Sequence, residues 1–173
     1  MEALNQIETS VDAVFAPCGG GGLLSGTVVA VKGFKKSIVV VGSEPALAND
    51  AARSLNEGKI FRWKKSPETL ADGAKTLSVT QRTLQYLKRL DVFHEISEKE
   101  ITYWTQWISH SLKLHIEPTA ALGMASAYRW LNEQSSKKTV VVILSGGNMD
   151  QKAINSIWSK DHLIKVPSKA LSF

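Results

Sequence analysis

Four short apolar runs, separated by longer stretches of helical pattern, constrain the fold of this chain more than any other feature. The runs are rich in β-branched residues and occupy residues 11–17, 37–44, 91–97 and 138–147. Continuous apolar runs of this length are typical of strands that are covered on both faces. Helical patterns follow at residues 23–32, 46–57, 78–90, 97–114 and 118–133. Strand and helix in alternation predict an α/β fold, a three-layer sandwich with a mostly parallel sheet of about four strands between helices.

Two helix starts carry recognisable signals, and the fold indicates where a ligand would bind. Ser97 and Glu100 have the spacing of a capping box, and Pro118 is suited to the first turn of a helix. Ligands of open parallel sheets bind at the carboxyl ends of the strands. The loops at residues 17–22, 43–50 and 145–148 are therefore the expected binding region.

Composition excludes several classes of protein. The 173 residues fit one domain, and no apolar stretch reaches the 18 residues of a membrane span. The single cysteine rules out an internal disulfide framework and favours a reducing compartment, so we expect a cytoplasmic protein. The net charge is +5, but the basic residues are dispersed and no nucleic-acid motif accompanies them. We expect neither nucleic acid nor a membrane as a partner.

A run of four glycines, Gly19 to Gly22, lies between the first apolar run and the first helical pattern. Glycines allow backbone N–H groups to approach an anion, and the start of the following helix adds partial positive charge. A tight turn from strand to helix is the alternative, but it needs only one or two glycines. The run matches neither GxGxxG nor a Walker loop. It predicts a cradle for a single phosphate monoester.

Four further motifs are ambiguous when each is taken alone. Ser145 begins a Ser-Gly-Gly-Asn stretch, which is also ordinary turn chemistry. Glu44 and Asp50 could bind a divalent cation through oxygen, or an acidic residue could cap a helix there. Gly73 lies in an Asp-Gly turn, and Glu117 precedes a helix start, where a carboxylate is favoured in any case.

The order and spacing of these motifs closely resemble the C-terminal half of the serine/threonine dehydratase and serine racemase family. The resemblance rests on "PCGGGGLLSG", "GSEPALAND", "LADGAK", "IEPTAALG" and "VVVILSGGNMD", and it extends from about Val11 to Asp150. These are pyridoxal-phosphate enzymes of the tryptophan-synthase-β fold type. The related cysteine synthases have a different phosphate loop and lack the Ser-Gly-Gly-Asn ending.

The resemblance implies roles for individual residues. Ser145 would face the pyridine nitrogen of pyridoxal 5'-phosphate, which suits elimination and racemisation better than transamination. Cys18 is expected to be buried packing. The phosphate and the remainder of the cofactor pocket would contact Gly19, Gly20, Gly21, Gly22, Leu23, Gly73 and Glu117. A magnesium or calcium ion would bind Glu44, the carbonyl of Ala48, and Asp50.

The resemblance also implies that one half of the enzyme is absent. The family's Schiff-base lysine lies in a Ser-x-Lys-x-Arg segment, and this sequence has none. We therefore expect a single partial cofactor-binding domain over residues 1–173, without the N-terminal catalytic-lysine half and without an identifiable catalytic residue. By itself such a chain would be inactive, and we expect it to self-associate or to bind the missing half.

The predicted function is that of part of a threonine/serine dehydratase, which converts its amino acid to a 2-keto acid and ammonia. A serine racemase-like enzyme is one alternative. The other is a catalytically inactive piece that acts only as a phosphate-binding or interaction domain.

Overall fold

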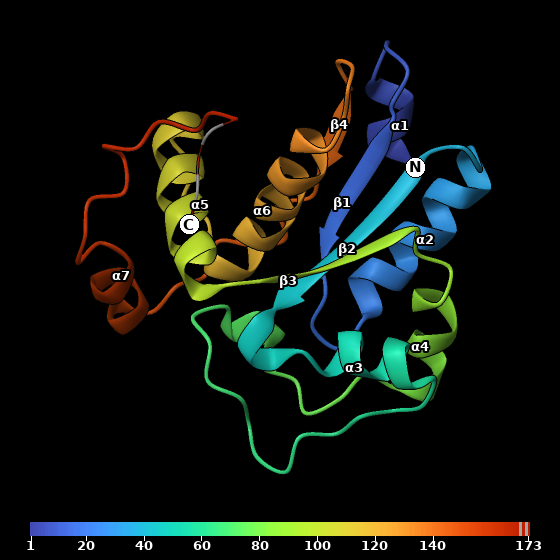
Figure 1. Cartoon of the computed structure of the whole chain (residues 1–173), viewed down its shortest axis with the longest axis horizontal. Helices are drawn as coiled ribbons and strands as arrows, with labels where there is room; N and C mark the ends of the chain where they lie inside the picture. Colours follow the sequence, from blue (N-terminus) through green and yellow to red (C-terminus); the bar gives the residue numbers. More distant parts are fainter. Residues whose placement is uncertain (170, 172) are drawn as a thin grey trace.

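Four parallel strands form one sheet in the order β3-β2-β1-β4 (Figure 1). The computed structural model describes residues 1–169, 171 and 173. Within them, no helix is both long and apolar enough to cross a bilayer. The elements in chain order are α1 (Glu2–Gln6), β1 (Ala13–Pro17), α2 (Gly22–Phe34), β2 (Val39–Pro45), the 3-10 helix η1 (Ala46–Ala48), α3 (Asp50–Glu57), the 3-10 helix η2 (Asp72–Ala74), α4 (Gln81–Leu87), β3 (Val92–Ile96), α5 (Glu98–Leu112), α6 (Pro118–Asn132), β4 (Val140–Val142) and α7 (Gln151–Ile157).

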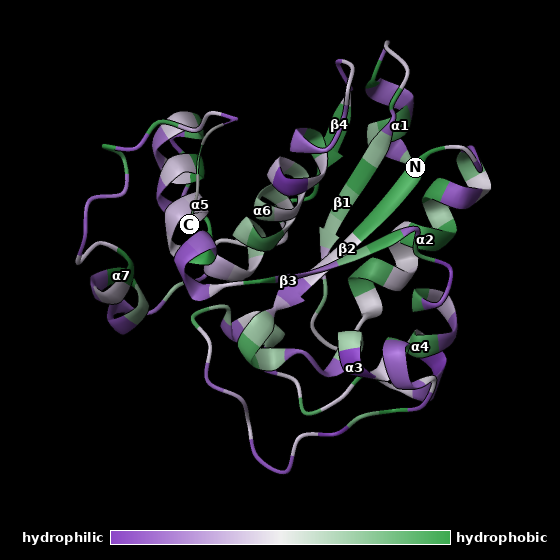
Figure 2. Ribbon diagram, in the orientation of Figure 1, coloured by the Kyte–Doolittle hydropathy of each residue, from purple (hydrophilic) through white to green (hydrophobic). Residues whose placement is uncertain are grey.

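The two central strands are buried along nearly their whole length. Every residue of β1 is buried, and β2 is buried from Val40 to Pro45. Their register pairs Ala13 with Val39 and Pro17 with Ser43, so both strands end at the same edge of the sheet. Figure 2 shows β1 and the first part of β2 in shades of the hydrophobic colour, whereas the carboxyl end of β2, which carries Ser43 and Glu44, is hydrophilic. Continuous burial explains why the sequence carries unbroken apolar runs here and no alternation.

Helices cover both faces of the sheet, which gives the three layers that the sequence predicts. On one face α6 packs against all four strands, and α5 packs outside α6. On the other face α2 packs against β1 and β2, and α4 packs against α2 (Figure 1). The α/β prediction is confirmed, and all four strands are parallel.

The predicted element types are confirmed, but several extents are wrong. The fourth strand was expected over residues 138–147 and spans only Val140–Val142, because it lies at the sheet edge and pairs only with β1. The helix expected over 78–90 is α4, which begins after its cap at Thr80. The helix expected over 46–57 is divided into η1 and α3. The short helices α1 and α7 were not predicted.

Both predicted helix starts are confirmed. Ser97 and Glu100 form a reciprocal capping box at the start of α5. Pro118 occupies the first turn of α6. These local signals hold because each satisfies backbone N–H groups, or removes one, at the helix end where no intrahelical partner exists.

Replacing Gly42 by alanine is expected to destabilise the fold by about 1–3 kcal/mol, which is typical of overpacking a dense core. A Cβ atom at Gly42 would lie 2.5 Å from Leu24 Cδ2 and 2.8 Å from Phe93 Cδ2. Urea unfolding monitored by tryptophan fluorescence measures the loss. Gly33→Ala is the matched control, since a Cβ at Gly33 meets nothing within 4 Å. Equal stability of the two variants would contradict this packing.

Candidate functional site

The chain passes from β1 into α2 through a loop whose conformation requires glycine at one position. Gly21 precedes α2 with a φ of 84°, in the left-handed region that side chains disfavour. No side chain caps α2, so the first N–H groups of the helix lack a side-chain partner. An uncapped helix start of this kind favours an anion.

Two close approaches hold this glycine loop in position. A Cβ atom at Gly19 would lie only 2.5 Å from the carbonyl oxygen of Gly73 in η2. A Cβ atom at Gly21 would lie 3.0 Å from Thr83 Cβ in α4. The loop therefore packs between η2 and α4, and Gly19 and Gly21 have steric reasons to be glycine that a simple turn would not supply.

A cavity of about 270 Å³ opens at this loop. The structure brings around it every cofactor-binding residue expected from the sequence, although these residues come from separate segments of the chain. Pro17 and Thr119 also line it and were not predicted, although Thr119 lies within the motif that supplied Glu117. The full lining is Pro17, Gly19, Gly20, Gly21, Gly22, Leu23, Gly73, Glu117, Thr119 and Ser145.

Glu117 joins the start of α6 to the loop after β4. Its backbone N–H donates to the carbonyl of Gly146 at 3.0 Å. A Cβ atom at Gly146 would lie 2.8 Å from Glu117 Oε2, so the carboxyl of Glu117 packs closely against the backbone of Gly146. Burial and the nearby Asp72 raise the pKa of Glu117, and the backbone N–H of Asn148 opposes this shift. The carboxyl is therefore easier to protonate than an exposed glutamate.

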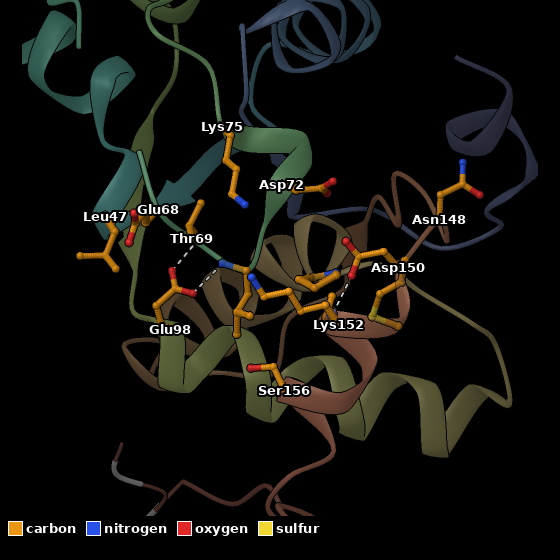
Figure 3. A pocket seen from close by; sticks show the side chains of 14 residues that line it. Leu47, Glu68, Thr69, Asp72, Lys75, Glu98, Asn148, Asp150, Lys152 and Ser156 are labelled. Atoms are coloured by element: carbon orange, nitrogen blue, oxygen red, sulfur yellow. Dashed lines mark hydrogen bonds between the residues drawn. The ribbon is translucent and has the colours of Figure 1, made fainter. Parts of the chain in front are cut away.

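A wider cavity of about 600 Å³ is lined in part by η2 and by the start of α6 (Figure 3). Asp72 and Pro118, which line it, are chain neighbours of Gly73, Glu117 and Thr119. Its charged lining is mixed and comprises Glu68, Asp72, Lys75, Glu98, Asp150 and Lys152. The segment from Thr69 to Lys75 thus contributes to both cavities, since Gly73 lines the smaller one and Asp72 lines the wider one.

The expected cation ligands meet behind the glycine loop, where they are buried. Glu44 accepts hydrogen bonds from the N–H groups of Ala51 at 3.1 Å and Ala52 at 2.7 Å, so it binds the first turn of α3. Asp50 Oδ1 is 3.5 Å from the hydroxyl of Thr76, while Asp50 Oδ2 is buried with no hydrogen-bond partner. Ala48 is also buried.

Burial dominates the electrostatics of this pair of carboxylates. Burial, with Asp50 as a further cause, raises the pKa of Glu44 to about 9. Burial raises the pKa of Asp50 to about 6. Among the residues that the structure describes, no third His, Cys, Asp or Glu joins them as a metal-binding group. The donor set is therefore two carboxylates, one of them already bound to a helix start, with an orphaned oxygen that a cation would satisfy.

Cys18 is buried, as expected from the sequence. Its N–H donates to the carbonyl of Ser43 at 2.7 Å, which ties the end of β1 to β2. Burial and the carboxylates of Glu44 and Asp50 raise the pKa of the thiol well above its usual range. A raised thiol pKa disfavours the nucleophilic thiolate, which agrees with a packing role.

Comparison with known proteins identifies relatives of this chain and its fold. The family model described as "Pyridoxal-phosphate dependent enzyme" matches residues 1–146. Serine racemase of Bos taurus is 38% identical over 165 residues, which are 93% of this chain and 48% of the relative. L-threo-3-hydroxyaspartate ammonia-lyase of Saccharomyces cerevisiae is 37% identical over 143 residues, 82% of this chain and 43% of the relative.

Solved structures agree with these relatives. The T.th. threonine deaminase superimposes with a TM-score of 0.80 at 38% identity, covering 86% of this chain and 55% of that chain. Maize serine racemase gives a TM-score of 0.80 at 30% identity, covering 94% and 50%. The chain spans about half the length of the curated relatives it matches. Fold, motif order and family model agree, and the chain belongs to the family of pyridoxal-phosphate dependent enzymes.

Proposed function

We propose that this chain is the cofactor-phosphate half of an ammonia-lyase that acts on serine or threonine and gives a 2-keto acid and ammonia. One observation carries the proposal: the glycine loop at the uncapped start of α2 closes a cavity that Ser145 and Glu117 also line. The cavity suits a small phosphate monoester attached to a ring. The threonine deaminase and the ammonia-lyase among the relatives support this reaction class.

Each residue of the cavity has a distinct proposed role toward pyridoxal phosphate. Gly19 to Gly22 and the N–H of Leu23 hold the phosphate. The hydroxyl of Ser145, which lines the cavity, would bind the ring nitrogen without forcing its protonation, since a hydroxyl can donate or accept. Glu117 and Gly73 line the ring side. When bound, the cofactor stabilises negative charge that develops at the substrate's α-carbon.

A Schiff base with pyridoxal phosphate requires a lysine, and that lysine must come from outside the residues that line this cavity. No residue among those that line the cavity is a lysine. The sequence also contains no Ser-x-Lys-x-Arg segment. We therefore propose that the complete site forms only with a lysine-bearing half, whose amine would hold the cofactor and serve as the base near the substrate's α-carbon.

Apolar surface near β4 supports this association. β4 is an edge strand and is only partly buried. A cavity of about 340 Å³ with a mostly apolar lining lies between α1, α2 and β4. Leu23 and Val29 of α2 are each 47% exposed. An edge strand beside apolar surface is a typical place for another strand to pair. A second copy of this chain, bound at the same surface, is the alternative to the lysine-bearing half.

Activity should depend on the lysine-bearing half. We expect the chain alone to release no 2-oxobutyrate from threonine and no pyruvate from serine. We expect release when it is purified with a separate chain that carries the lysine segment, in the presence of pyridoxal phosphate. Intact mass detects that second chain, and lactate dehydrogenase coupling measures the keto acid. A stable complex that binds the cofactor but forms no keto acid would favour the inactive phosphate-binding alternative.

A serine racemase activity is a second candidate, because serine racemases are among the relatives and reach 38% identity. Glu44, the carbonyl of Ala48, and Asp50 would bind magnesium or calcium, and the orphaned Asp50 Oδ2 supports this site. Chiral chromatography of the reaction with L-serine separates the two activities, since only the racemase forms D-serine.

A cytoplasmic location stays a prediction from the sequence.

A further inference from the structure

The segment from Thr69 to Lys75 is tied to the rest of the molecule at two places. Glu98 accepts hydrogen bonds from the hydroxyl of Thr69 at 2.6 Å and from the N–H of Leu70 at 2.8 Å (Figure 3). Further along, the N–H of Gly73 donates to the hydroxyl oxygen of Thr119 at 3.1 Å. The second bond joins η2 to the first turn of α6 across 46 residues. A helix cap joins residues only a few positions apart, so this bond is a tertiary contact and not a cap.

Thr119, Gly73 and Gly19 are stacked in direct succession. A Cβ atom at Gly73 would lie 2.9 Å from Thr119 Oγ1 and 3.3 Å from Thr119 Cγ2. The carbonyl of Gly73, in turn, is the atom that would meet a Cβ at Gly19, at 2.5 Å. Thr119 is only 6% exposed, so it has little freedom to yield. The position of Thr119 therefore fixes the position of Gly73, which in turn limits where the glycine loop lies.

Thr119 also faces the ligand cavity, because it lines the 270 Å³ space together with the four glycines. Its hydroxyl accepts from Gly73. A hydroxyl has one proton to donate besides the lone pairs that accept. Within the described residues, no protein acceptor takes that proton from Thr119, so it is available to an anion in the cavity.

We propose that Thr119 is the positioning residue of the phosphate cradle. Its hydroxyl holds Gly73 against Gly19, and this contact fixes where the N–H groups of the glycine loop lie. This inference rests on the proposed phosphate-binding function. It assigns to the start of α6 a role in phosphate affinity, whereas Pro118 and Glu117 beside it account only for the helix start and the ring side of the cavity.

Isothermal titration with pyridoxine 5'-phosphate tests the inference, since this ligand has no aldehyde and cannot react with lysines. Thr119→Val keeps the shape but removes the hydroxyl, and we expect about a tenfold weaker Kd, which corresponds to one lost hydrogen bond. Thr119→Ser keeps the hydroxyl and should bind within about twofold to threefold of the unsubstituted chain. Thr105→Val is the matched control, because Thr105 is buried and its hydroxyl donates to Ile101 within α5. It should leave the Kd unchanged.

The outcomes separate this inference from the proposed function. If the unsubstituted chain binds neither pyridoxine 5'-phosphate nor inorganic phosphate, the cradle itself fails, and the inference fails with it. If that chain binds but Thr119→Val binds equally well, or if Thr119→Val and Thr105→Val weaken binding equally, only the inference is overturned. Should Thr119→Val not fold, amide exchange of the unsubstituted chain decides. Bound ligand should slow exchange at Gly73, and unchanged exchange would overturn the inference.

Discussion

Replacing Gly19 by alanine is expected to weaken binding of pyridoxine 5'-phosphate at least about a hundredfold, which corresponds to about 2.7 kcal/mol. The added Cβ would lie 2.5 Å from the backbone oxygen of Gly73 and 3.4 Å from Cα of Ala74. Both obstacles are backbone atoms, and the hydrogen bond from Gly73 to Thr119 restrains them. The glycine loop must therefore move, and its N–H groups leave the positions that an anion requires. Isothermal titration measures the change.

Gly26→Ala is the control for this substitution. Gly26 lies in α2, and a Cβ there meets nothing within 4 Å. Alanine is the better helix former by up to about 1 kcal/mol, so this variant should bind as the unsubstituted chain does and unfold at a slightly higher temperature. Wild-type affinity in Gly19→Ala would mean that the glycine loop does not contact the phosphate.

The sequence predicts the layers and the location of the cavity because both depend on local patterns. Unbroken apolar runs indicate the central strands, where every residue of β1 is buried. The carboxyl ends of parallel strands meet at one edge, so the loop after β1 and the loop after β4 had to lie near each other. The glycine run and Ser145 could therefore be assigned to one region from the fold alone, whereas Glu117, which follows no strand, was assigned to it only by the family resemblance.

Contacts between segments far apart in the chain could not be predicted from local sequence patterns. Thr119 binds Gly73 across 46 residues, and no periodicity in the sequence signals that bond. The apolar run at 138–147 gave too long a strand, because the extent of an edge strand depends on its one neighbour and β1 pairs with only three residues of it. The carboxyl of Glu44 illustrates a third limit. Its spacing from Asp50 suited both a cation site and a helix cap, and its bonds to Ala51 and Ala52 fulfil the second while the first stays a prediction.

Stability should fall as pH rises from about 4 to about 9 when divalent cations are removed. The pKa of Asp50 is raised to about 6 and that of Glu44 to about 9, whereas unfolded carboxyls titrate near 4. The folded chain therefore binds more protons than the unfolded chain across this window, and the free energy of unfolding decreases with pH. We expect a loss of a few kcal/mol in urea unfolding, since each pKa unit corresponds to about 1.4 kcal/mol.

Substitutions and cations identify the groups responsible. Asp50→Asn and Glu44→Gln should each flatten the pH dependence of the free energy of unfolding. Glu57→Gln should leave it unchanged, because Glu57 is an exposed residue of α3, the helix that begins at Asp50. Calcium or magnesium, added at pH 8, should restore stability to the unsubstituted chain and not to Asp50→Asn, because a ligand that binds only the folded state raises its stability by mass action. If neither ion restores stability while the pH dependence persists, the pair holds a proton and no cation. If the stability does not change with pH, the pKa values of Glu44 and Asp50 are not raised in the folded chain, and the prediction is wrong.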